Sequence, residues 1–546
     1  MLRFLSRREA EHPYLLTASQ AKEDDRWTME HYGLSSLVLM ERAALAVSER
    51  IHRVADPIGE KADVLVVAGV GNNGGDGLAV ARILASENRR VQVWIVGDQT
   101  KASEEFQKQR DILQKYPVEY CDKPKKDEYT IIVDALFGVG LSREVTGVFL
   151  EAVEAMNRLS GYVIAVDVPS GIDATTGAVL GTAVCADETV TFQHLKRGLV
   201  LYPGAYFAKD VTVAPIGLEH YPCGTGLFTY TLPCTEYLPG RSPMGNKSTF
   251  GKILLAAGSL NMAGAAILAA GAAYRTGAGM VKVISCEENR IPIQTAVPEA
   301  LFGTQEQLPD SLGWADVIAI GPGIGKTEAA RRMLRTVIEQ SDKPLLLDAD
   351  ALNLLSEDDT LREKLSRQAK AGRTVVMTPH PGELSRWMKR PVEELRKNLI
   401  QAARDCSYAC GFVVVAKDAR TIVSEGTGQQ YINLSGNDGL ATAGSGDVLT
   451  GIIAALLPVQ EDAFSAACLG CYLHGLAADL LAEDKGKISL MAGDLPDAVS
   501  KVFMEEKGLI YHAENREDTG ILQSGLRRGR SGCRCEQPVQ YEGCDR

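Results

Sequence analysis

The sequence predicts an α/β protein with two domains, each built on a largely parallel sheet that helices cover on both faces. Its 546 residues exceed what one hydrophobic core normally holds, at roughly 100–200 residues per domain. Short, continuously apolar strands alternate with loops and helices, an order typical of parallel sheets. This alternation stops near residue 218 and resumes near residue 252. We therefore expect domains at residues 1–222 and 223–512, followed by a tail at residues 513–546.

The first domain is expected to begin with a helix and to continue as alternating strands and helices. Thr17–Gln20 is a capping-box pattern that predicts a helix to about His31, with Gly33 as its stop. A second helix is expected at Leu78–Ala85, directly after a glycine-rich loop. The predicted strands are short and apolar, and the alternation ends near residues 213–218; these strands are Asp63–Ala68, Val91–Val96, Thr130–Val133 and Tyr162–Val166.

The second domain follows a connector, at about residues 219–245, that is rich in Pro, Gly, Tyr and Thr. We predict a tightly packed helix at Ala263–Arg275 and a helical C-terminal part from about Val448 to Lys507. The last two strands should be antiparallel neighbours around Lys417–Arg420. The predicted strands are Lys252–Ala257, Met280–Ser285, Val317–Ile320, Pro344–Asp348, Thr374–Met377, Phe412–Ala416 and Thr421–Ser424.

Composition and charge exclude several classes of protein. Apolar residues make up 45% of the chain and charged residues 23%, as in ordinary globular proteins. With 70 acidic and 58 basic residues the net charge is −12, so no nucleic-acid partner is expected, because such binding needs a Lys/Arg excess. Neither a signal peptide after Met1–Arg8 nor a membrane span is expected. Twelve cysteines without disulfide spacing favour a reducing, cytoplasmic location.

The tail after about Glu514 differs in composition from the rest of the chain. It is rich in Gly, Arg, Ser and Gln, and its six acidic and six basic residues cancel, so we expect it to be disordered. It also contains Cys533, Cys535 and Cys544. A zinc site needs about four ligands, and a fourth is not evident, so zinc binding is not favoured.

The first candidate site is Gly69–Gly77 (GVGNNGGDG), which follows a strand and opens a helix. Glycines there let backbone N–H groups face outward, and the helix N-terminus adds partial positive charge, so the segment suits a phosphate. Asn72, Asn73 and Asp76 add oxygens suited to a metal or a polar ring. The segment also matches GxGxxG, but the acid of a dinucleotide fingerprint could only be Asp98, which equally well belongs to a turn. A plain strand–helix turn with polar caps is the structural alternative.

Two further loops leave strand ends of the same predicted sheet. One begins at Asp134 and runs to Glu144 (DALFGVGLSRE), and the other spans Asp167–Asp173 (DVPSGID). Ligands of an open parallel sheet bind outside the carboxyl ends of its strands, where all three loops should lie. An aspartate that follows an apolar strand is often a helix cap or a turn residue. If Asp134 and Asp167 converge on one crevice, they make an acid/base and cation-ligand pair.

With these three motifs and LVLMERAA at Leu37–Ala44, the sequence resembles the NAD(P)H-hydrate epimerase domain over about residues 14–218. The resemblance implies a Rossmann-like three-layer α/β/α fold that binds a hydrated nicotinamide nucleotide. It assigns Asp167 as the catalytic acid/base at the reacting ring and gives a potassium ion the oxygen ligands Asn73, Asp134 and Ser170. It assigns to the substrate Asn72, Asn73, Gly74, Gly75, Asp76, Gly138, Val139, Gly140, Leu141, Ser142, Arg143, Glu144 and Asp167.

The second candidate site is Asn437–Gly451 (NDGLATAGSGDVLTG), another glycine-rich loop that runs into a helix. Its GSGD places backbone amides at a helix N-terminus, which suits a nucleotide's terminal phosphates, with Asp447 at the mouth. A carboxylate beside a phosphoryl centre can deprotonate an attacking hydroxyl. The alternative is that Asp447 caps the helix, although a cap does not explain the three glycines or the preceding Asn-Asp-Gly.

Polar residues also follow other predicted strands of this half. His380 lies between two prolines in Thr378–Glu383 (TPHPGE), which stiffens its backbone and aims its ring, although a lone histidine is more often structural. Lys417–Thr421 (KDART) is either an exposed charged turn or a cover for a nucleotide's phosphate and ribose. Gly321–Lys326 (GPGIGK) and Asp348–Asn353 (DADALN) are further loops of this kind.

With these motifs the second half resembles the ADP/ATP-dependent NAD(P)H-hydrate dehydratase family, which has a ribokinase-like fold, over about residues 225–510. The family's opening HKG-like motif stands here as Asn246-Lys247-Ser248. The resemblance assigns to the hydrated nucleotide Ala265, Gly325, His380 and the catalytic Asp447. It assigns to the adenine nucleotide Lys417, Asp418, Ala419, Arg420, Thr421 and Gly446.

Together the two resemblances imply a bifunctional isomerase and lyase that repairs hydrated NADH and NADPH (NADHX and NADPHX). The first site would interconvert the R and S hydrates by proton transfer at ring carbon C6, with K⁺ neutralising charge. The second would phosphorylate the 6-hydroxyl of the S hydrate from ADP or ATP, with Mg²⁺ at the phosphates, and eliminate phosphate to restore NAD(P)H. A homo-oligomer is also expected.

Three other functions remain open. A vitamin-type kinase would keep its phosphorylated product and would not regenerate the absorbance of the reduced nicotinamide. A dehydrogenase built on GxGxxG would oxidise a substrate without consuming an adenine nucleotide. If the first half were a non-catalytic nucleotide-sensing or scaffold module, replacing Asp167 by alanine would leave repair of the racemic hydrate unchanged.

Overall fold

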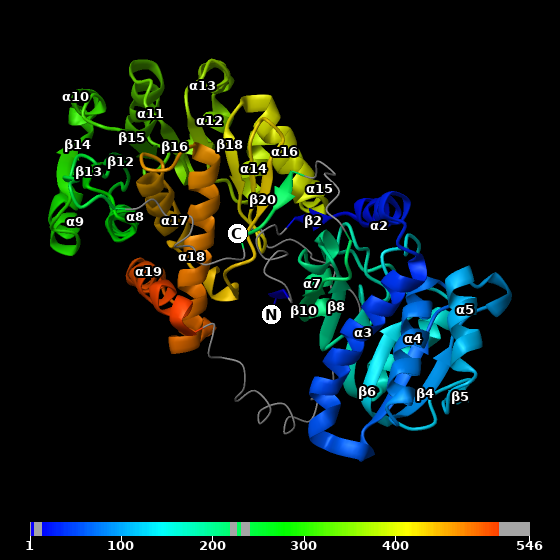
Figure 1. Cartoon of the computed structure of the whole chain (residues 1–546). Helices are drawn as coiled ribbons and strands as arrows, with labels where there is room; N and C mark the ends of the chain where they lie inside the picture. The colour runs from blue at the N-terminus through cyan, green and yellow to red at the C-terminus, as the bar shows by residue number, and fades with distance from the viewer. Residues whose placement is uncertain (1, 5–13, 219–225, 231–240, 513–546) are drawn as a thin grey trace.

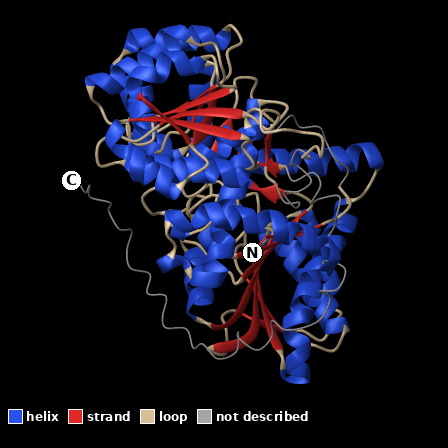
Figure 2. Cartoon of the chain, turned by 90° about the vertical axis from the view of Figure 1, so that its left-hand side faces the viewer, coloured by secondary structure: helices blue, strands red, loops and turns tan. Residues whose placement is uncertain are grey.

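The computed structural model describes residues 2–4, 14–218, 226–230 and 241–512. Within these residues the N-terminal half, up to residue 218, contains an eight-stranded sheet, and the C-terminal half, from residue 226, a ten-stranded sheet. Each sheet lies between helices (Figures 1 and 2). Both halves therefore have the three-layer α/β/α architecture that the sequence predicts.

The first sheet has the strand order β1-β10-β8-β7-β6-β3-β4-β5, and its neighbouring strands are parallel. The chain proceeds from β3 to β4 on one side and later returns to β6 on the other, so the loops after β3 and β6 diverge and open a crevice. The strands are β1 Leu2–Phe4, β3 Asp63–Ala68, β4 Arg90–Ile95, β5 Glu119–Cys121, β6 Glu128–Ala135, β7 Ser160–Val166, β8 Glu188–Phe192 and β10 Asp210–Ala214, with β2 Leu15–Leu16 and β9 Leu195–Lys196 forming a separate pair.

The helices of the N-terminal half are α2 Ala18–Tyr32, α3 Ser36–Ala55, α4 Asn72–Ser86, α5 Glu104–Leu113, α6 Val148–Arg158 and α7 Gly204–Ala208. α2 confirms the capping-box prediction, because the Thr17 hydroxyl accepts the Gln20 N–H and the Gln20 side chain accepts the Thr17 N–H. It ends at Gly33, whose φ of +68° lies in the left-handed region that favours glycine. The predicted stop is therefore also confirmed.

The second sheet has the order β11-β20-β19-β18-β17-β16-β15-β12-β13-β14. β19 is antiparallel to both β18 and β20, which confirms the predicted reversal around Lys417–Arg420, and the other neighbours are parallel. The strands are β11 Leu227–Phe228, β12 Lys252–Ala256, β13 Met280–Ser285, β14 Leu301–Thr304, β15 Val317–Ile320, β16 Leu345–Leu347, β17 Val375–Met377, β18 Val413–Ala416, β19 Ile422–Ser424 and β20 Gln430–Ile432.

Helices cover both faces of this second sheet, and close packing explains its small residues. A Cβ added to Gly451 of α17 would lie 2.1 Å from the Ala269 carbonyl oxygen of α8, so only glycine permits this approach. The helices are α8 Ala263–Thr276, α9 Arg290–Ala296, α10 Leu308–Leu312, α11 Glu328–Gln340, α12 Ala349–Glu357, α13 Asp359–Lys370, α14 Pro381–Met388, α15 Val392–Lys397, α16 Leu399–Cys410, α17 Ser445–Leu456, α18 Ala463–Lys485 and α19 Leu495–His512.

α18 is the one helix within the described ranges that is long and apolar enough to cross a membrane. Of its most apolar stretch 78% is buried, and it packs against α17 and α19. Its apolar surface is therefore used inside the protein.

The sequence prediction lacks three strands of the first sheet, β1, β5 and β8, and β8 shows one reason. Its sequence, ETVTF, alternates polar with apolar residues, yet Glu188 is 2% exposed. The Arg50 side chain of α3 offsets this buried charge, with its Nε 2.6 Å from a Glu188 carboxylate oxygen. A buried strand that carries polar residues does not show the continuous apolar run on which the prediction relied.

The predicted disorder of residues 513–546 and the zinc question at Cys533, Cys535 and Cys544 lie outside the described residues. The same holds for most of the connector, residues 219–225 and 231–240.

The two halves contact each other. Tyr14 pairs with Phe228 in an isolated antiparallel bridge, and the Arg420 guanidinium donates a hydrogen bond to the Val200 carbonyl oxygen, 3.0 Å away. Leu15 and Leu227 belong to one continuous cluster of buried apolar side chains. The halves are thus joined by a shared apolar surface as well as by the connector.

Candidate active sites

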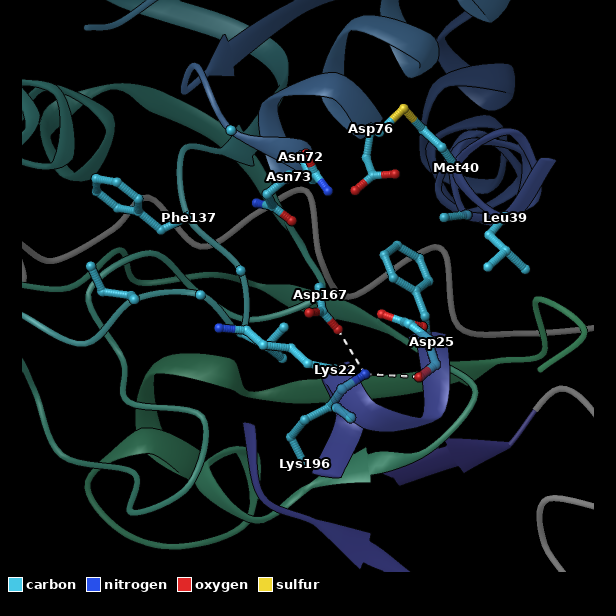
Figure 3. A pocket seen from close by; sticks show the side chains of 18 of the residues that line it. Lys22, Asp25, Leu39, Met40, Asn72, Asn73, Asp76, Phe137, Asp167 and Lys196 are labelled. Atoms are coloured by element: carbon cyan, nitrogen blue, oxygen red, sulfur yellow. Dashed lines mark hydrogen bonds and ion pairs between the residues drawn. The ribbon is translucent and has the colours of Figure 1, made fainter. Parts of the chain in front are cut away.

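A cavity of about 870 Å³ lies at the carboxyl edge of β3, β6 and β7 in the N-terminal half (Figure 3). This is the crevice that the divergence of the β3 and β6 loops produces. Residues of α2, α3 and α4 form part of its wall. Of the residues predicted to bind the substrate, those that line it are Asn72, Asn73, Asp76, Gly138, Val139, Gly140, Leu141, Ser142, Arg143 and Asp167.

The other predicted residues of this set are not among those that line the cavity. A Cβ at Gly74 would lie 1.7 Å from the Gly69 carbonyl oxygen, and a Cβ at Gly75 would lie 2.8 Å from Cε of Met40. These two glycines therefore allow α4 to pack against the preceding loop and α3. Glu144 also stands outside the lining residues.

The prediction that the helix begins at Leu78 was wrong, because α4 begins at Asn72. The sequence suggested a loop because glycine is a poor helix former. Here the helix contains glycines because a side chain at Gly74, Gly75 or Gly77 would collide with neighbouring atoms. Asn73 and Asp76 consequently stand one helical turn apart, both on the cavity side of α4.

Asp134, at the end of β6, is fully buried. Its carboxylate accepts hydrogen bonds from the Ser170 hydroxyl (2.6 Å) and the Ser170 backbone N–H (2.7 Å). Burial raises the pKa of Asp134 to about 6, although the hydrogen bonds from Ser170 oppose that shift. In the described part of the chain no basic side chain forms an ion pair with this carboxyl. A cation would therefore be favoured beside it.

The donor set at this point suits a hard monovalent cation. Asn73, Asp134 and Ser170 offer an amide, a carboxylate and a hydroxyl oxygen, all of the type that such ions prefer. The Nδ2 atom of Asn73 is buried and lacks a hydrogen-bond partner among the described residues. A Cβ at Gly138 would lie 2.9 Å from the Asn73 amide oxygen, so glycine leaves this oxygen accessible from the loop after β6.

Asp167 follows β7 and points into the cavity (Figure 3). The Nζ atom of Lys196 lies 2.8 Å from one carboxylate oxygen, which also accepts a hydrogen bond from the Thr191 hydroxyl at 3.1 Å. Its φ of +67° is uncommon for a residue with a side chain and is a form of strain that occurs at functional sites. The strained backbone and the two partners hold the carboxylate in one orientation.

The sequence prediction lacked five charged residues that line this cavity, namely Lys22, Asp24, Asp25, Glu105 and Lys196. Lys22 and Asp25 lie on α2 and line the cavity, as does Lys196. Burial raises the pKa of Asp25 to about 6, and the nearby Lys196 ammonium partly opposes this. Lys22, Asp25 and Met29 follow an i, i+3, i+7 pattern, which marks one helix face and was the available signal.

The second site lies at the carboxyl ends of β16, β17 and β18, centred on Asp348. Asp348 is 1% exposed and accepts hydrogen bonds from Lys417 Nζ (2.9 Å) and the Thr378 hydroxyl (2.7 Å). The Thr450 hydroxyl of α17 donates to its other oxygen at 2.9 Å. Asp348 was not named individually from the sequence, although it begins the DADALN motif. It connects three strand ends to the helix that carries GSGD.

Asp447 lies in the first turn of α17, which begins at Ser445 with Gly444 as its N-cap. Because Gly444 occupies the cap position, the interpretation of Asp447 as a helix cap is not supported. Burial and then the charge of Asp348 raise the pKa of Asp447 to about 6, while Lys417 opposes the shift. A Cβ at Gly446 would lie 3.4 Å from Lys417 Nζ, so GSGD and the lysine meet.

His380 makes hydrogen bonds at the start of α14, and much of its side chain is also exposed. It precedes α14, its Nδ1 accepts the Gly382 N–H at 3.0 Å, and Glu383 accepts the His380 N–H at 2.9 Å. The side chain is nevertheless 52% exposed at this edge of the sheet. Burial lowers the pKa of His380 and raises that of Glu383 to about 7. A neutral ring is therefore favoured, and because its Nδ1 accepts the Gly382 N–H, its Nε2 carries the hydrogen and can donate a hydrogen bond.

Gly325 belongs to the loop after β15, and Ala265 belongs to the first turn of α8, which follows the loop after β12. Gly325 has a φ of +72° and donates its N–H to the Asp350 carboxylate at 2.8 Å. Ala265 is in the first turn of α8, where a Cβ at Gly323 would lie 3.0 Å from its own Cβ. Both loops thus reach the same edge of the sheet as Asp348.

The segment Lys417–Thr421 divides into parts with different contacts. Burial would lower the pKa of Lys417, but the charges of Asp348 and Glu383 outweigh it and raise the pKa. Asp418 pairs with Arg396 at 3.2 Å, Ala419 is exposed, and the Thr421 carbonyl oxygen accepts the N–H of Asn433. Arg420 contacts the N-terminal half. The segment is therefore not simply an exposed charged turn.

Comparison with known proteins finds relatives of both halves. A family model described as "NAD(P)H-hydrate dehydratase" matches residues 253–501, and one described as "YjeF-related protein N-terminus" matches residues 36–198. A solved Bacillus subtilis protein, titled ADP/ATP-dependent NAD(P)H-hydrate dehydratase co-crystallised with ATP/Mg²⁺, is 32% identical with a TM-score of 0.44 and covers 50% of this chain and 96% of its own.

Curated relatives match almost the whole chain. The bifunctional NAD(P)H-hydrate repair enzyme of Moorella thermoacetica is 34% identical over 526 residues, covering 90% of this chain and 96% of the relative. The enzyme of the same name from Escherichia coli is 34% identical over 496 residues, covering 90% and 94%. This similarity extends across both sites, and the chain belongs to the family of bifunctional NAD(P)H-hydrate repair enzymes.

Proposed function

We propose that this chain repairs hydrated NADH and NADPH at two sites. It epimerises the R and S hydrates at the N-terminal site and dehydrates the S hydrate to NAD(P)H at the C-terminal site. Membership of the family supports both activities. The division of labour corresponds to two functional units, residues 1–222 and 223–512, since the last strand of the first sheet ends at Ala214 and the first strand of the second begins at Leu227.

At the N-terminal site the hydrated ring lies in the cavity of Figure 3, beside Asp167. Asn72, Asn73 and the loop Gly138–Arg143 bind and orient the nucleotide. Asp167 acts as the acid/base at the C6 substituent, and Lys196 at 2.8 Å balances its charge and fixes its position. Strain and fixed partners suit a group that must keep one orientation through the reaction.

Potassium is the ion that we assign to Asn73, Asp134 and Ser170. The buried Asp134 carboxyl without a basic partner in the described residues and the all-oxygen donor set support this assignment. When bound, the ion supplies positive charge beside the nucleotide site. The chain's own part is to fix the Ser170 hydroxyl and the Asp134 carboxylate beside each other through the hydrogen bonds between these two residues.

At the C-terminal site Asp447 is the base that takes the proton of the 6-hydroxyl. Its pKa of about 6 leaves it mainly ionised at neutral pH and still basic enough to accept a proton. The hydroxyl oxygen then bonds to the terminal phosphorus of ADP or ATP, the bond from that phosphorus to the bridging oxygen breaks, and AMP or ADP leaves. Phosphate leaves as a ring proton is lost, which restores the double bond, because phosphate is a far better leaving group than hydroxide.

The remaining residues of the second site position the reactants. Ala265, Gly325 and His380 contact the hydrated nucleotide, and Gly446 with Lys417–Thr421 contacts the adenine nucleotide. The ammonium of Lys417 and the first-turn amides of α17 suit phosphate oxygens. Mg²⁺ bound with the nucleotide neutralises phosphate charge during transfer.

We place this reaction in the cytoplasm and expect a homo-oligomer, which stays a prediction. Seven cysteines in the described ranges are free thiols, a state that suits a reducing compartment. NADHX, NADPHX and ADP or ATP are the partners that we assign, with no nucleic acid and no membrane.

The observation that carries the proposal is the pair of separate sheet-edge sites, one with Asp167 fixed by Lys196 and one with Asp447 beside Lys417. The test is incubation of racemic hydrate with ADP and Mg²⁺ while the near-ultraviolet absorbance of NAD(P)H is followed. We expect complete repair by the unaltered chain and repair of the S half alone by Asp167→Ala.

Asp447→Ala should give no NAD(P)H but should still equilibrate the epimers, which chromatography separates. Failure of the unaltered chain to regenerate NAD(P)H would refute the dehydratase activity. Full repair by Asp167→Ala would show that the N-terminal half does not catalyse epimerisation.

A further inference from the structure

The N-terminal cavity contains a second carboxyl that faces Asp167. Asp76 projects from α4 and Asp167 from the loop after β7; in Figure 3 they lie on two sides of the space between these elements, and the Asp167 carboxyl is turned toward Lys196. The two are close enough for the charge of Asp167 to act on Asp76. A ring bound in this cavity would have one carboxyl toward each side.

The surroundings of the two carboxyls differ. Asp167 has the Lys196 ammonium at 2.8 Å and the Thr191 hydroxyl at 3.1 Å. Asp76 is bonded to no cation or donor among the residues that the structure describes. Burial, and then the charges of Asp167 and Asp25, raise the pKa of Asp76 well above its ordinary value. Asp76 is thus suited to carry a proton, whereas Asp167 is paired with the Lys196 ammonium.

Inversion of the hydrate at C6 requires two groups that transfer protons. C6 carries a hydroxyl and is bonded to the ring nitrogen, so its C–H is not acidic, but its C–O bond can break with help from the nitrogen lone pair. The resulting cation is planar at C6, and water can add to either face. Inversion therefore needs an acid where the hydroxyl leaves and a base where water enters.

We propose that Asp76 is the second catalytic residue of the epimerase, acting on the face of the ring opposite Asp167. This inference rests on the epimerase activity proposed above. In one direction Asp76 donates its proton to the departing hydroxyl, the C6–O bond breaks and water is released. Water then adds at the opposite face, a new C6–O bond forms, and Asp167 takes its proton. The reverse reaction exchanges the two roles, so atoms and charge balance.

The experiment measures oxygen exchange and epimerisation together, in the full-length chain without ADP. The pure R hydrate is incubated in water enriched in ¹⁸O, and the S product is analysed by mass spectrometry, with an enzyme-free sample for the background. Asp76→Asn is compared with Asp98→Asn, an exposed aspartate that caps a short turn outside the cavity. Dehydration of the S hydrate by each variant checks that the chain is folded.

The unaltered chain and Asp98→Asn should incorporate one ¹⁸O atom per inversion. Asp76→Asn should lose about 10²–10³-fold in kcat for epimerisation with little change in KM, the size expected for loss of a general acid. An increase in KM alone would make Asp76 a binding residue and overturn the inference.

Inversion by the unaltered chain without ¹⁸O incorporation would also overturn it, and this result does not depend on how any variant folds. If the unaltered chain did not epimerise at all, the proposed epimerase function itself would fail. The two failures are therefore distinguishable.

Discussion

The charge of Asp447 depends on two neighbouring side chains of opposite charge, Asp348 and Lys417. Asp348 and burial raise its pKa to about 6, and Lys417 opposes them. As a base it must be ionised, so we predict that kcat of the dehydratase falls below about pH 6, by about tenfold per pH unit. The measurement is a pH–rate profile with the S hydrate and ADP at saturation.

Replacing Lys417 by methionine removes the one group among the described residues that lowers the pKa of Asp447. The acid limb of the profile should then move to higher pH. Lys364→Met is the matched control, because that lysine pairs with Glu339 at the surface and should leave the limb in place. An unmoved limb in Lys417→Met would mean that Asp447 is not the group that titrates.

Asp134 links ion binding to stability. Its folded-state pKa of about 6 exceeds the ordinary value of 3.8, so the stabilisation that its protonation gives is complete below about pH 4 and is lost as the pH rises through 6. Potassium should restore it, because the ion binds the ionised carboxylate. We predict that K⁺ raises the thermal midpoint by a few degrees at pH 8 and much less at pH 5.

The control for this measurement is choline at equal ionic strength, and the matched variant is Asp134→Asn. Choline should not raise the thermal midpoint of the unaltered chain, and K⁺ should not raise that of Asp134→Asn. An equal K⁺ effect in Asp134→Asn would place the ion elsewhere.

Among the elements, α4 depends most directly on glycine. A Cβ at Gly74 would meet the Gly69 carbonyl oxygen at 1.7 Å, whereas a Cβ at Gly71 would meet nothing within 4 Å. Gly74→Ala should therefore lower the free energy of unfolding by about 1–3 kcal/mol, as overpacking does. Gly71→Ala should change it by less than about 0.5 kcal/mol.

Urea unfolding is monitored by hydrogen exchange at the backbone amides of α4. This separates the loss of stability in the N-terminal half from changes in the C-terminal half. Equal stability of the two alanine variants would show that the first turns of α4 are not packed as described.

The strands of both sheets could largely be predicted because their apolar runs reflect burial on two faces. β3, β13 and β15 have the predicted bounds. β8 was missed because its buried Glu188 is balanced by Arg50 from a distant helix, a pairing that local sequence does not contain. The start of α4 was missed for a related reason, since its glycines are explained only by tertiary contacts.

In the candidate sites, too, local motifs could be predicted from the sequence, whereas residues brought in by tertiary contacts could not. The glycine-rich motifs were recognisable, and most of the residues assigned to the first site line the cavity. Asp25 and Lys196 were not predicted, because they belong to α2 and β9, which approach Asp167 only in the folded chain. Asp348 needed the structure to reveal its contacts with three other elements.

At the scale of the whole molecule, Arg420 connects the two halves. Its guanidinium donates to the Val200 carbonyl oxygen (3.0 Å) of the N-terminal half and to that of Leu434 (3.3 Å), and it lies over the Tyr202 ring. Arg420→Met leaves both carbonyl oxygens without this donor, so we predict a loss of about 1–3 kcal/mol in the stability of the contact.

The readout is protease sensitivity of the full-length chain, which should rise because the halves separate more often. Arg396→Met, which breaks an exposed pair with Asp418, should not alter it. If both variants resisted protease like the unaltered chain, Arg420 would not hold the halves together.

The central claim is that one chain carries two independent catalytic sites that act in sequence, and mixing two inactive variants tests it most directly. Asp167→Ala and Asp447→Ala are each incubated with pure R hydrate, ADP and Mg²⁺, and then together. Asp447→Ala alone should form no NAD(P)H, and Asp167→Ala alone should form it only as fast as the R hydrate epimerises without enzyme. The mixture should form NAD(P)H much faster than either variant, because each variant supplies the site that the other lacks. A mixture as inactive as its components would contradict the account.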